Sequence, residues 1–196
     1  MIEILAALSA SAAAGMRIAL PLLIIGLLQT DNLWSRLPLL NYIHPSVLLG
    51  ILTSWSLFEL FASKKLLGQR MLQVVQLLFS PIVGAIMGIA VAQFAEAPTI
   101  FVWIVGIVGG LLAFVLQLVQ VGWFFRLRGL PLWVVFIQDI LCVALVIFAF
   151  DAPRQGGLIA LVLLWLAIRS SKQWHRWYVG QHRSRERRRF RREMSD

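Results

Sequence analysis

Hydrophobic residues make up 60% of this 196-residue chain and charged residues only 14%, with a mean hydropathy of +0.82. This composition excludes an ordinary soluble globular protein and predicts an all-α, polytopic integral membrane protein. The formal net charge of +9 is concentrated near the C-terminus, because the stretch from residue 169 onward holds ten Lys or Arg and three acids. The single cysteine, Cys142, excludes an internal disulfide.

Six apolar segments have the length of a membrane crossing or nearly so. The sequence therefore predicts a six-helix transmembrane domain over residues 1–171 and a basic cytoplasmic tail over residues 172–196. Lys and Arg are frequent only in alternate loops, as expected when six crossings leave both termini in the cytoplasm. Glu3 replaces the basic start of a signal peptide, so we expect the first helix to be retained. The expected spans are residues 4–28, 45–63, 71–95, 99–124, 131–150 and 156–171.

The first expected span holds a charged residue near its centre. At about 1.5 Å per residue this segment is long enough to cross a bilayer, which puts Arg17 near the middle of the hydrocarbon. A charge at that depth costs at least about 2.5 kcal/mol, so Arg17 must face partners or water rather than lipid. Gly15 and Pro21 interrupt this span, and Pro81 interrupts the third. We expect kinks at these positions in preference to the fully broken helices of a transporter.

Polar side chains inside the expected spans lie at the midplane or in the cytoplasmic half. Asp139 matches the depth of Arg17, so we predict that the two residues pair. The cluster has two open interpretations. It is a buried ion pair with hydrogen bonds that fix helix packing, or a polar site that opens to the cytoplasm and takes an ion, a small anionic ligand or a lipid headgroup. The candidate site residues are Arg17, Glu59, Gln76, Gln117, Gln120 and Asp139.

No pattern typical of an enzyme occurs in the sequence. The three histidines have no second ligand at metal-binding spacing, and no nucleophile, nucleotide or cofactor motif is present. We therefore expect no catalytic residues, no metal and no cofactor. Serines within the spans, such as Ser9 and Ser11, are expected to bond back to carbonyls of their own helix.

The basic tail has three interpretations. A positive-inside anchor is the simplest one. Binding of anionic lipid headgroups, at about 1 kcal/mol per Lys or Arg near the surface, is the functional one. Nucleic acid ranks behind both, although basic runs bind polyanions regardless of sequence. The residues expected to contact headgroups are Arg183, Arg185, Arg187, Arg188, Arg189, Arg191 and Arg192.

Four short motifs resemble recurring motifs of a bacterial membrane-protein family catalogued as domain of unknown function 4126. They are AAAGMRIALP (12–21), FELFASKK (58–65), SPIVGA (80–85) and IQDILCVAL (137–145). The resemblance covers most of residues 4–170 and implies a polytopic inner-membrane protein, but it supplies no activity. The matching positions are Arg17, Glu59, Pro81 and Asp139.

These observations support two main functional hypotheses, both for a multi-pass protein embedded in the lipid bilayer. The first is a small transporter or channel-like protein, which water reaching Arg17 from the cytoplasm would favour. The alternative is a non-transporting scaffold or assembly factor, which a fully paired cluster beside an exposed face of small residues would favour. A lipid-modifying enzyme ranks third. The composition suits the inner (cytoplasmic) membrane of a cell and leaves a thylakoid membrane open.

Overall fold

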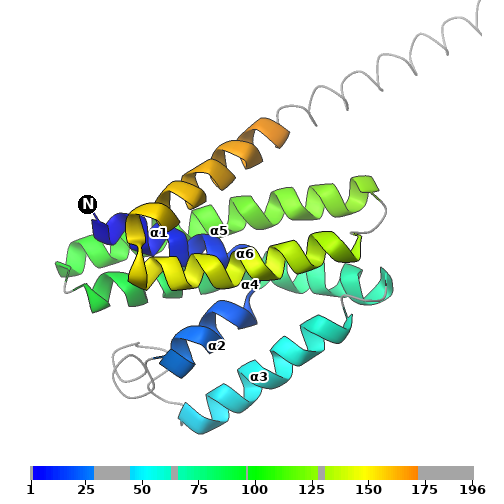
Figure 1. Cartoon of the computed structure of the whole chain (residues 1–196), viewed down its shortest axis with the longest axis horizontal. Coiled ribbons are helices and arrows are strands. Elements are labelled where there is room, and N and C mark those ends of the chain that lie inside the picture. The colour runs from blue at the N-terminus through cyan, green and yellow to red at the C-terminus, as the bar shows by residue number, and fades with distance from the viewer. Residues whose placement is uncertain (1, 29–44, 63–65, 96, 128–130, 172–196) are drawn as a thin grey trace, which may run out of the picture.

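The computed structural model describes residues 2–28, 45–62, 66–95, 97–127 and 131–171, and these ranges hold helices and no strand. The all-α class predicted from the sequence is therefore confirmed for the described chain. Figure 1 shows the helices in chain order, from α1 in blue to the unlabelled orange helix over residues 153–171. The others are α1 (Ile2–Ala14), α2 (Ala19–Leu28), α3 (Pro45–Ala62), α4 (Leu66–Phe94), α5 (Thr99–Leu127) and α6 (Leu132–Asp151).

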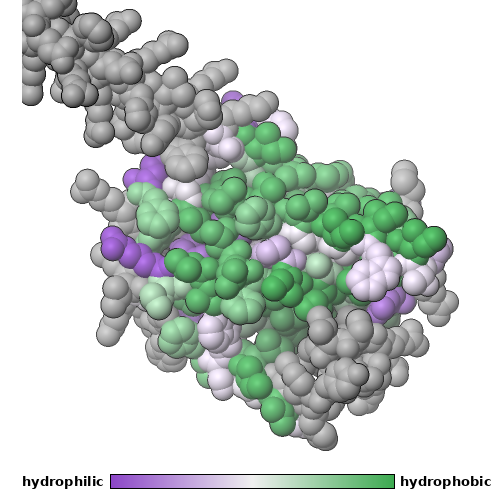
Figure 2. Space-filling view, turned by 180° about the vertical axis from the view of Figure 1, so that it is seen from behind, coloured by the Kyte–Doolittle hydropathy of each residue, from purple (hydrophilic) through white to green (hydrophobic). Residues whose placement is uncertain are grey.

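Three of these helices are long and apolar enough to cross a membrane: Gly68–Phe94, Thr99–Arg126 and Trp133–Asp151. The outer surface fits this environment, because apolar side chains cover most of the described area in Figure 2. On α5, large exposed apolar residues recur every three or four positions, so one face of the helix points away from the bundle. An exposed apolar surface of this extent is typical of a protein embedded in lipid. The residues of this face include Ile100, Trp103, Ile107, Leu111, Phe114 and Leu118.

The first predicted span, residues 4–28, is not one helix. It consists of α1, which ends at Ala14, and α2, which begins at Ala19. With 13 residues, α1 is about 20 Å long, shorter than the hydrocarbon core of a bilayer. After the break, α2 turns back toward the end of the bundle at which α1 begins and packs beside α3 (Figure 1). The segment is therefore a helical hairpin, hereafter the α1–α2 hairpin.

Pro21 makes a continuous helix through residues 4–28 unfavourable. In a continuous helix the N–H of residue 21 would bond to the carbonyl of Arg17, but proline has no N–H and its ring clashes with that carbonyl. In the structure Pro21 lies in the first turn of α2, where a backbone donor is not needed. Pro81 differs, because α4 continues through it from Leu66 to Phe94.

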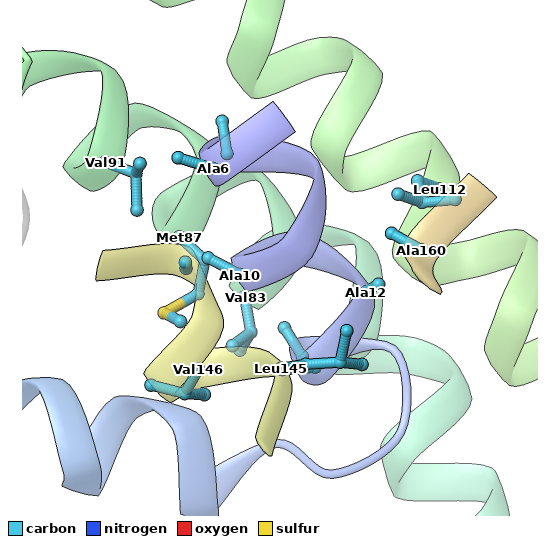
Figure 3. Close-up of a cluster of buried hydrophobic side chains, with 14 of the residues drawn as sticks. Ala6, Ala10, Ala12, Val83, Met87, Val91, Leu112, Leu145, Val146 and Ala160 are labelled. Carbon is cyan, nitrogen blue, oxygen red and sulfur yellow. The ribbon is translucent and has the colours of Figure 1, made fainter. Parts of the chain in front are cut away.

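Helix α1 lies at the centre of the bundle, packed against α4, α5 and α6. Its buried residues are alanines and serines, which allow the neighbouring backbones to approach closely. Met87 and Val91 of α4 and Leu145 and Val146 of α6 gather around it to form an apolar core (Figure 3). The two buried serines donate hydrogen bonds to carbonyls of neighbouring helices and not to their own: Ser9 Oγ to Leu145 O at 2.7 Å, and Ser11 Oγ to Gly84 O at 2.9 Å.

The membrane topology expected from the sequence is not confirmed. Gly15 lies against the backbone of Ala113, near the middle of α5, so α1 ends about halfway along the bundle. Helix α1 begins at the end of the bundle where α5 begins, whereas the seventh helix runs toward the opposite end (Figure 1). This arrangement does not support the predicted six crossings with both termini in the cytoplasm. The predicted basic tail, residues 172–196, lies outside the described residues.

Helices α1, α4 and α5 meet through glycines. A Cβ atom added to Gly109 of α5 would clash with Ser11 Oγ and lie 2.9 Å from the carbonyl oxygen of Gly84. A Cβ added to Gly122, thirteen positions further along the same helix, would meet no atom within 4 Å. These two glycines therefore differ in whether the fold requires them.

We expect Gly109→Ala to lower the free energy of unfolding by about 1–3 kcal/mol, because the added methyl group forces α1, α4 and α5 apart. Gly122→Ala is the matched control and should be neutral or slightly stabilising, since alanine is the better helix former. Thermal unfolding of the purified full-length variants in detergent measures the difference. Equal melting temperatures for the two variants would contradict the close packing at Gly109.

Candidate functional site

An ion pair lies at the tip of the α1–α2 hairpin. Arg17 occupies the non-helical stretch between α1 and α2, and its Nε atom donates to Oδ1 of Asp139 on α6 at 2.6 Å. Both side chains are largely buried, with exposed fractions of 7% and 17%. The pairing predicted from their matching depth is confirmed.

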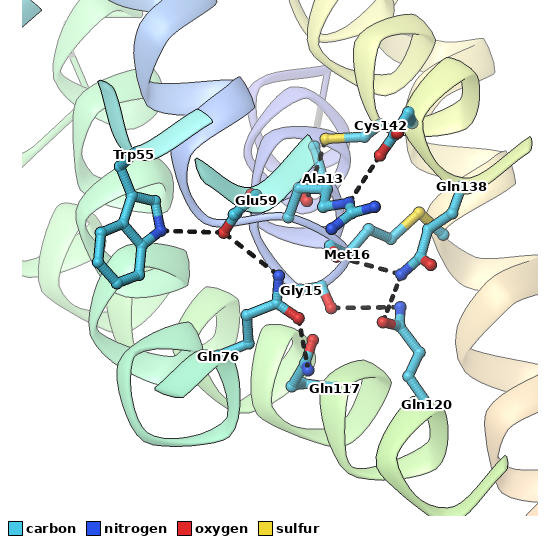
Figure 4. A network of polar contacts seen from close by, with 12 residues as sticks. Ala13, Gly15, Met16, Trp55, Glu59, Gln76, Gln117, Gln120, Gln138 and Cys142 are labelled. Carbon is cyan, nitrogen blue, oxygen red and sulfur yellow. Dashed lines mark hydrogen bonds and ion pairs between the residues drawn. The ribbon is translucent and has the colours of Figure 1, made fainter. Parts of the chain in front are cut away.

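The break in the helix leaves the carbonyls of Gly15 and Met16, just beyond the end of α1, without intrahelical partners. Side chains of α5 and α6 bond to them (Figure 4): Gln138 Nε2 donates to Met16 O at 3.1 Å, and Gln120 Nε2 donates to Gly15 O at 3.4 Å. Cys142 Sγ lies 3.4 Å from the carbonyl oxygen of Ala13 and donates to it. Such partners are required where irregular backbone lies at membrane depth. Gln120, predicted as a site residue, therefore supports the hairpin backbone.

A second network centres on Glu59, which is 2% exposed. One of its oxygens, Oε1, accepts hydrogen bonds from Trp55 Nε1 at 3.0 Å and from Gln76 Nε2 at 3.3 Å. Gln117 Nε2 extends the network by donating to Gln76 Oε1 at 3.4 Å and to Gln73 Oε1 at 3.3 Å. Figure 4 shows the chain from Trp55 through Glu59 and Gln76 to Gln117.

This second network is not fully satisfied. Glu59 Oε2 and Gln117 Oε1 are buried and have no hydrogen-bond partner among the described residues. Buried polar atoms are nearly always paired, and each one left over costs about 1–3 kcal/mol unless water, an ion or a ligand satisfies it. The network therefore has capacity for a further group.

Two cavities border the hairpin tip. The first is polar, has a volume of about 20 Å³, and is lined by Arg17, Gln69, Leu72, Gln73, Gln76, Val135 and Gln138. That is enough space for one water molecule. The second, of about 320 Å³, lies between α5, α6 and the seventh helix and is lined mostly by apolar side chains. Gln138 lines both cavities, so the hairpin tip stands between a polar and an apolar space.

All six residues predicted for the polar site take part in these two networks. Their functional role stays a prediction. The selection missed Trp55, Gln73 and Gln138. Trp55 could have been found from its spacing, because it lies one helical turn before Glu59, within side-chain reach.

The remaining predictions concern metals and lipids. No group of three or more histidine, cysteine or acidic residues gathers as a metal site within the described ranges. The arginines predicted to bind lipid headgroups, residues 183–192, lie outside the described residues, so that interaction stays a prediction.

We expect Asp139→Asn to be strongly destabilising, by about 3–5 kcal/mol, because it leaves the buried Arg17 charge without its anion. The double variant Arg17→Gln with Asp139→Asn removes both charges and should recover part of that loss. A double-mutant cycle based on thermal unfolding of the full-length protein measures the coupling. Strictly additive effects of the two substitutions would contradict a stabilising pair at the hairpin tip.

Comparison with known proteins identifies a family but no activity. No match was found among curated proteins or among solved structures. A family model described as Domain of unknown function (DUF4126) matches residues 4–173. This match runs from α1 to beyond the seventh helix and includes the hairpin, both hydrogen-bond networks and both cavities. The resemblance expected from the four motifs is confirmed, and the chain belongs to the DUF4126 family.

Proposed function

We propose that this protein is a small membrane transporter whose solute binds at the tip of the α1–α2 hairpin. The observation that carries the proposal is the non-helical, charged hairpin tip, buried halfway along the bundle beside a polar cavity. Irregular backbone at membrane depth is tolerated where it lines a cavity or is buried in protein. Broken helices of this kind form the solute sites of many transporters.

The distribution of polar groups supports a site that opens to one side. The half of the bundle around α1 is closed by apolar packing, whereas the glutamines of α4, α5 and α6 lie between the hairpin tip and the other end. That other end carries the exposed basic residues Arg70 and Arg126. By the positive-inside rule this end faces the cytoplasm. The solute would then enter from the cytoplasm, and movement of the hairpin would open the opposite side.

The charges of the cluster favour a small cation as the solute. The cluster holds two carboxyl groups, on Asp139 and Glu59, and a single cation, Arg17, which is already bonded to Asp139, so ionisation of Glu59 would give the cluster a net negative charge. The other polar groups lining the cavity are amides, which coordinate ions without adding charge. An anion would have to displace Asp139 from Arg17.

The scaffold alternative loses its main support. It predicted a fully paired cluster beside an exposed face of small residues. Instead, the small residues of α1 pack inside the bundle, as do Gly84 and Gly109, so they do not form an exposed face. The cluster also retains buried polar atoms without partners among the described residues.

Ion currents from reconstituted protein test the proposal. Proteoliposomes of the full-length chain are adsorbed on a solid-supported membrane and exposed to jumps in Na⁺, K⁺, Cl⁻ or pH. We expect a transient current for at least one cation, abolished by Arg17→Gln and retained in Gly122→Ala, which changes an open position. Wild-type protein that is folded and yields no current with any of these ions would overturn the transport function.

Thiol labelling tests the one-sided opening. In a Cys142→Ala background, a cysteine replacing Gln73 lines the polar cavity, whereas one replacing Leu145 lies in the fully buried apolar core. We expect a small thiol reagent to label position 73 from the side bearing Arg126 and to leave position 145 unlabelled from both sides. Equal labelling of the two positions, or labelling of neither, would contradict an opening toward that side.

A further inference from the structure

The buried carboxyl group of Glu59 is bonded asymmetrically. Its Oε1 atom accepts two hydrogen bonds, from Trp55 and Gln76, whereas Oε2 is buried without a partner among the described residues. This pattern fits a neutral carboxylic acid, in which one oxygen accepts and the other carries a proton that it can donate. In a carboxylate the atom left without a partner would carry part of a buried negative charge, whereas in the acid it belongs to a neutral O–H group, which costs less to bury.

The charges around Glu59 lead to the same conclusion. Of the helices packed against α3, α2 has no ionisable side chain, and the one on α4, Arg70, is exposed. Among the described residues, the charged groups that act on Glu59 electrostatically are Arg17 and Asp139, which are bonded to each other. Cys142, also on α6, is a buried free thiol. An ionised Glu59 would therefore be an uncompensated charge inside the membrane, which is costly.

We propose that Glu59 is a proton-binding site and that its proton drives the solute movement at the hairpin tip. Gln76 connects the two sites, because it donates to Glu59 and also lines the polar cavity next to Arg17. Release of the proton would add a negative charge beside the Arg17–Asp139 pair and compete for Arg17. The ion pair, and with it the hairpin, would then have two states, one with Glu59 protonated and one with Glu59 ionised. The proton binding stands by itself, and the coupling rests on the proposed transport function.

Infrared difference spectroscopy tests proton binding directly. Full-length protein in a lipid film is stepped through pH, and the carbonyl stretch of protonated carboxyl groups is recorded. We expect a titrating band that is lost in Glu59→Gln and retained in Asp151→Asn, a change at an exposed carboxyl group outside the cluster. A wild type without such a band, or a band that persists in Glu59→Gln, would overturn the proposal.

Two further measurements keep the test decisive if Glu59→Gln does not fold. Trp55→Phe removes one hydrogen bond to Oε1 and should move the band to higher wavenumber, while an unmoved band would assign it to another carboxyl group. Replacing choline by sodium at constant pH should leave the band unchanged, and its loss would assign the site to sodium instead. If the Glu59 band is present but the protein gives no ion currents, the proposed transport function is wrong and proton binding stands. If currents are present without the band, proton binding at Glu59 is wrong and the transport function stands.

Discussion

The polar half of the molecule depends on one requirement. The charge of Arg17 and the carbonyls of Gly15 and Met16 must all find partners at a depth where water is scarce. The structure meets it with side chains from α5 and α6, which bond to the α1–α2 hairpin from two sides. Because these partners come from two helices, α5 and α6, the hairpin tip also fixes how those helices sit against one another.

The same requirement divides the bundle into two halves with different physical properties. Around α1, alanines, serines and glycines allow backbones to touch, and the packing is apolar and closed. Beyond the hairpin tip, glutamines bond to one another and surround a cavity of about 20 Å³. A tightly packed half cannot admit a solute unless the hairpin moves. A network with buried oxygens left unpaired among the described residues can rearrange at lower cost.

The sequence predicted the long helices well, because Pro98, Pro131 and charged residues end apolar runs close to where α4, α5 and α6 end or begin. It also predicted the Arg17–Asp139 pair, since Arg17 lies at mid-depth whether the chain crosses or turns back. The hairpin itself was missed. Residues on both sides of Arg17 are apolar in either case, so composition contains no information on chain direction, and only Gly15 and Pro21 signalled a break. The roles of Gln120 and Gln138 depend on that break and could not be predicted without it.

The orientation of α1 is the central claim, and its most direct test is the side of the membrane on which each end of α1 and α5 lies. Single cysteines at the exposed positions Glu3 and Arg126, in a Cys142→Ala background, are labelled with a membrane-impermeant thiol reagent in oriented vesicles. A hairpin that enters and leaves on one side predicts labelling of the two positions from opposite sides of the membrane. Labelling of both positions from the same side would mean that residues 4–28 cross the membrane, and it would contradict the hairpin.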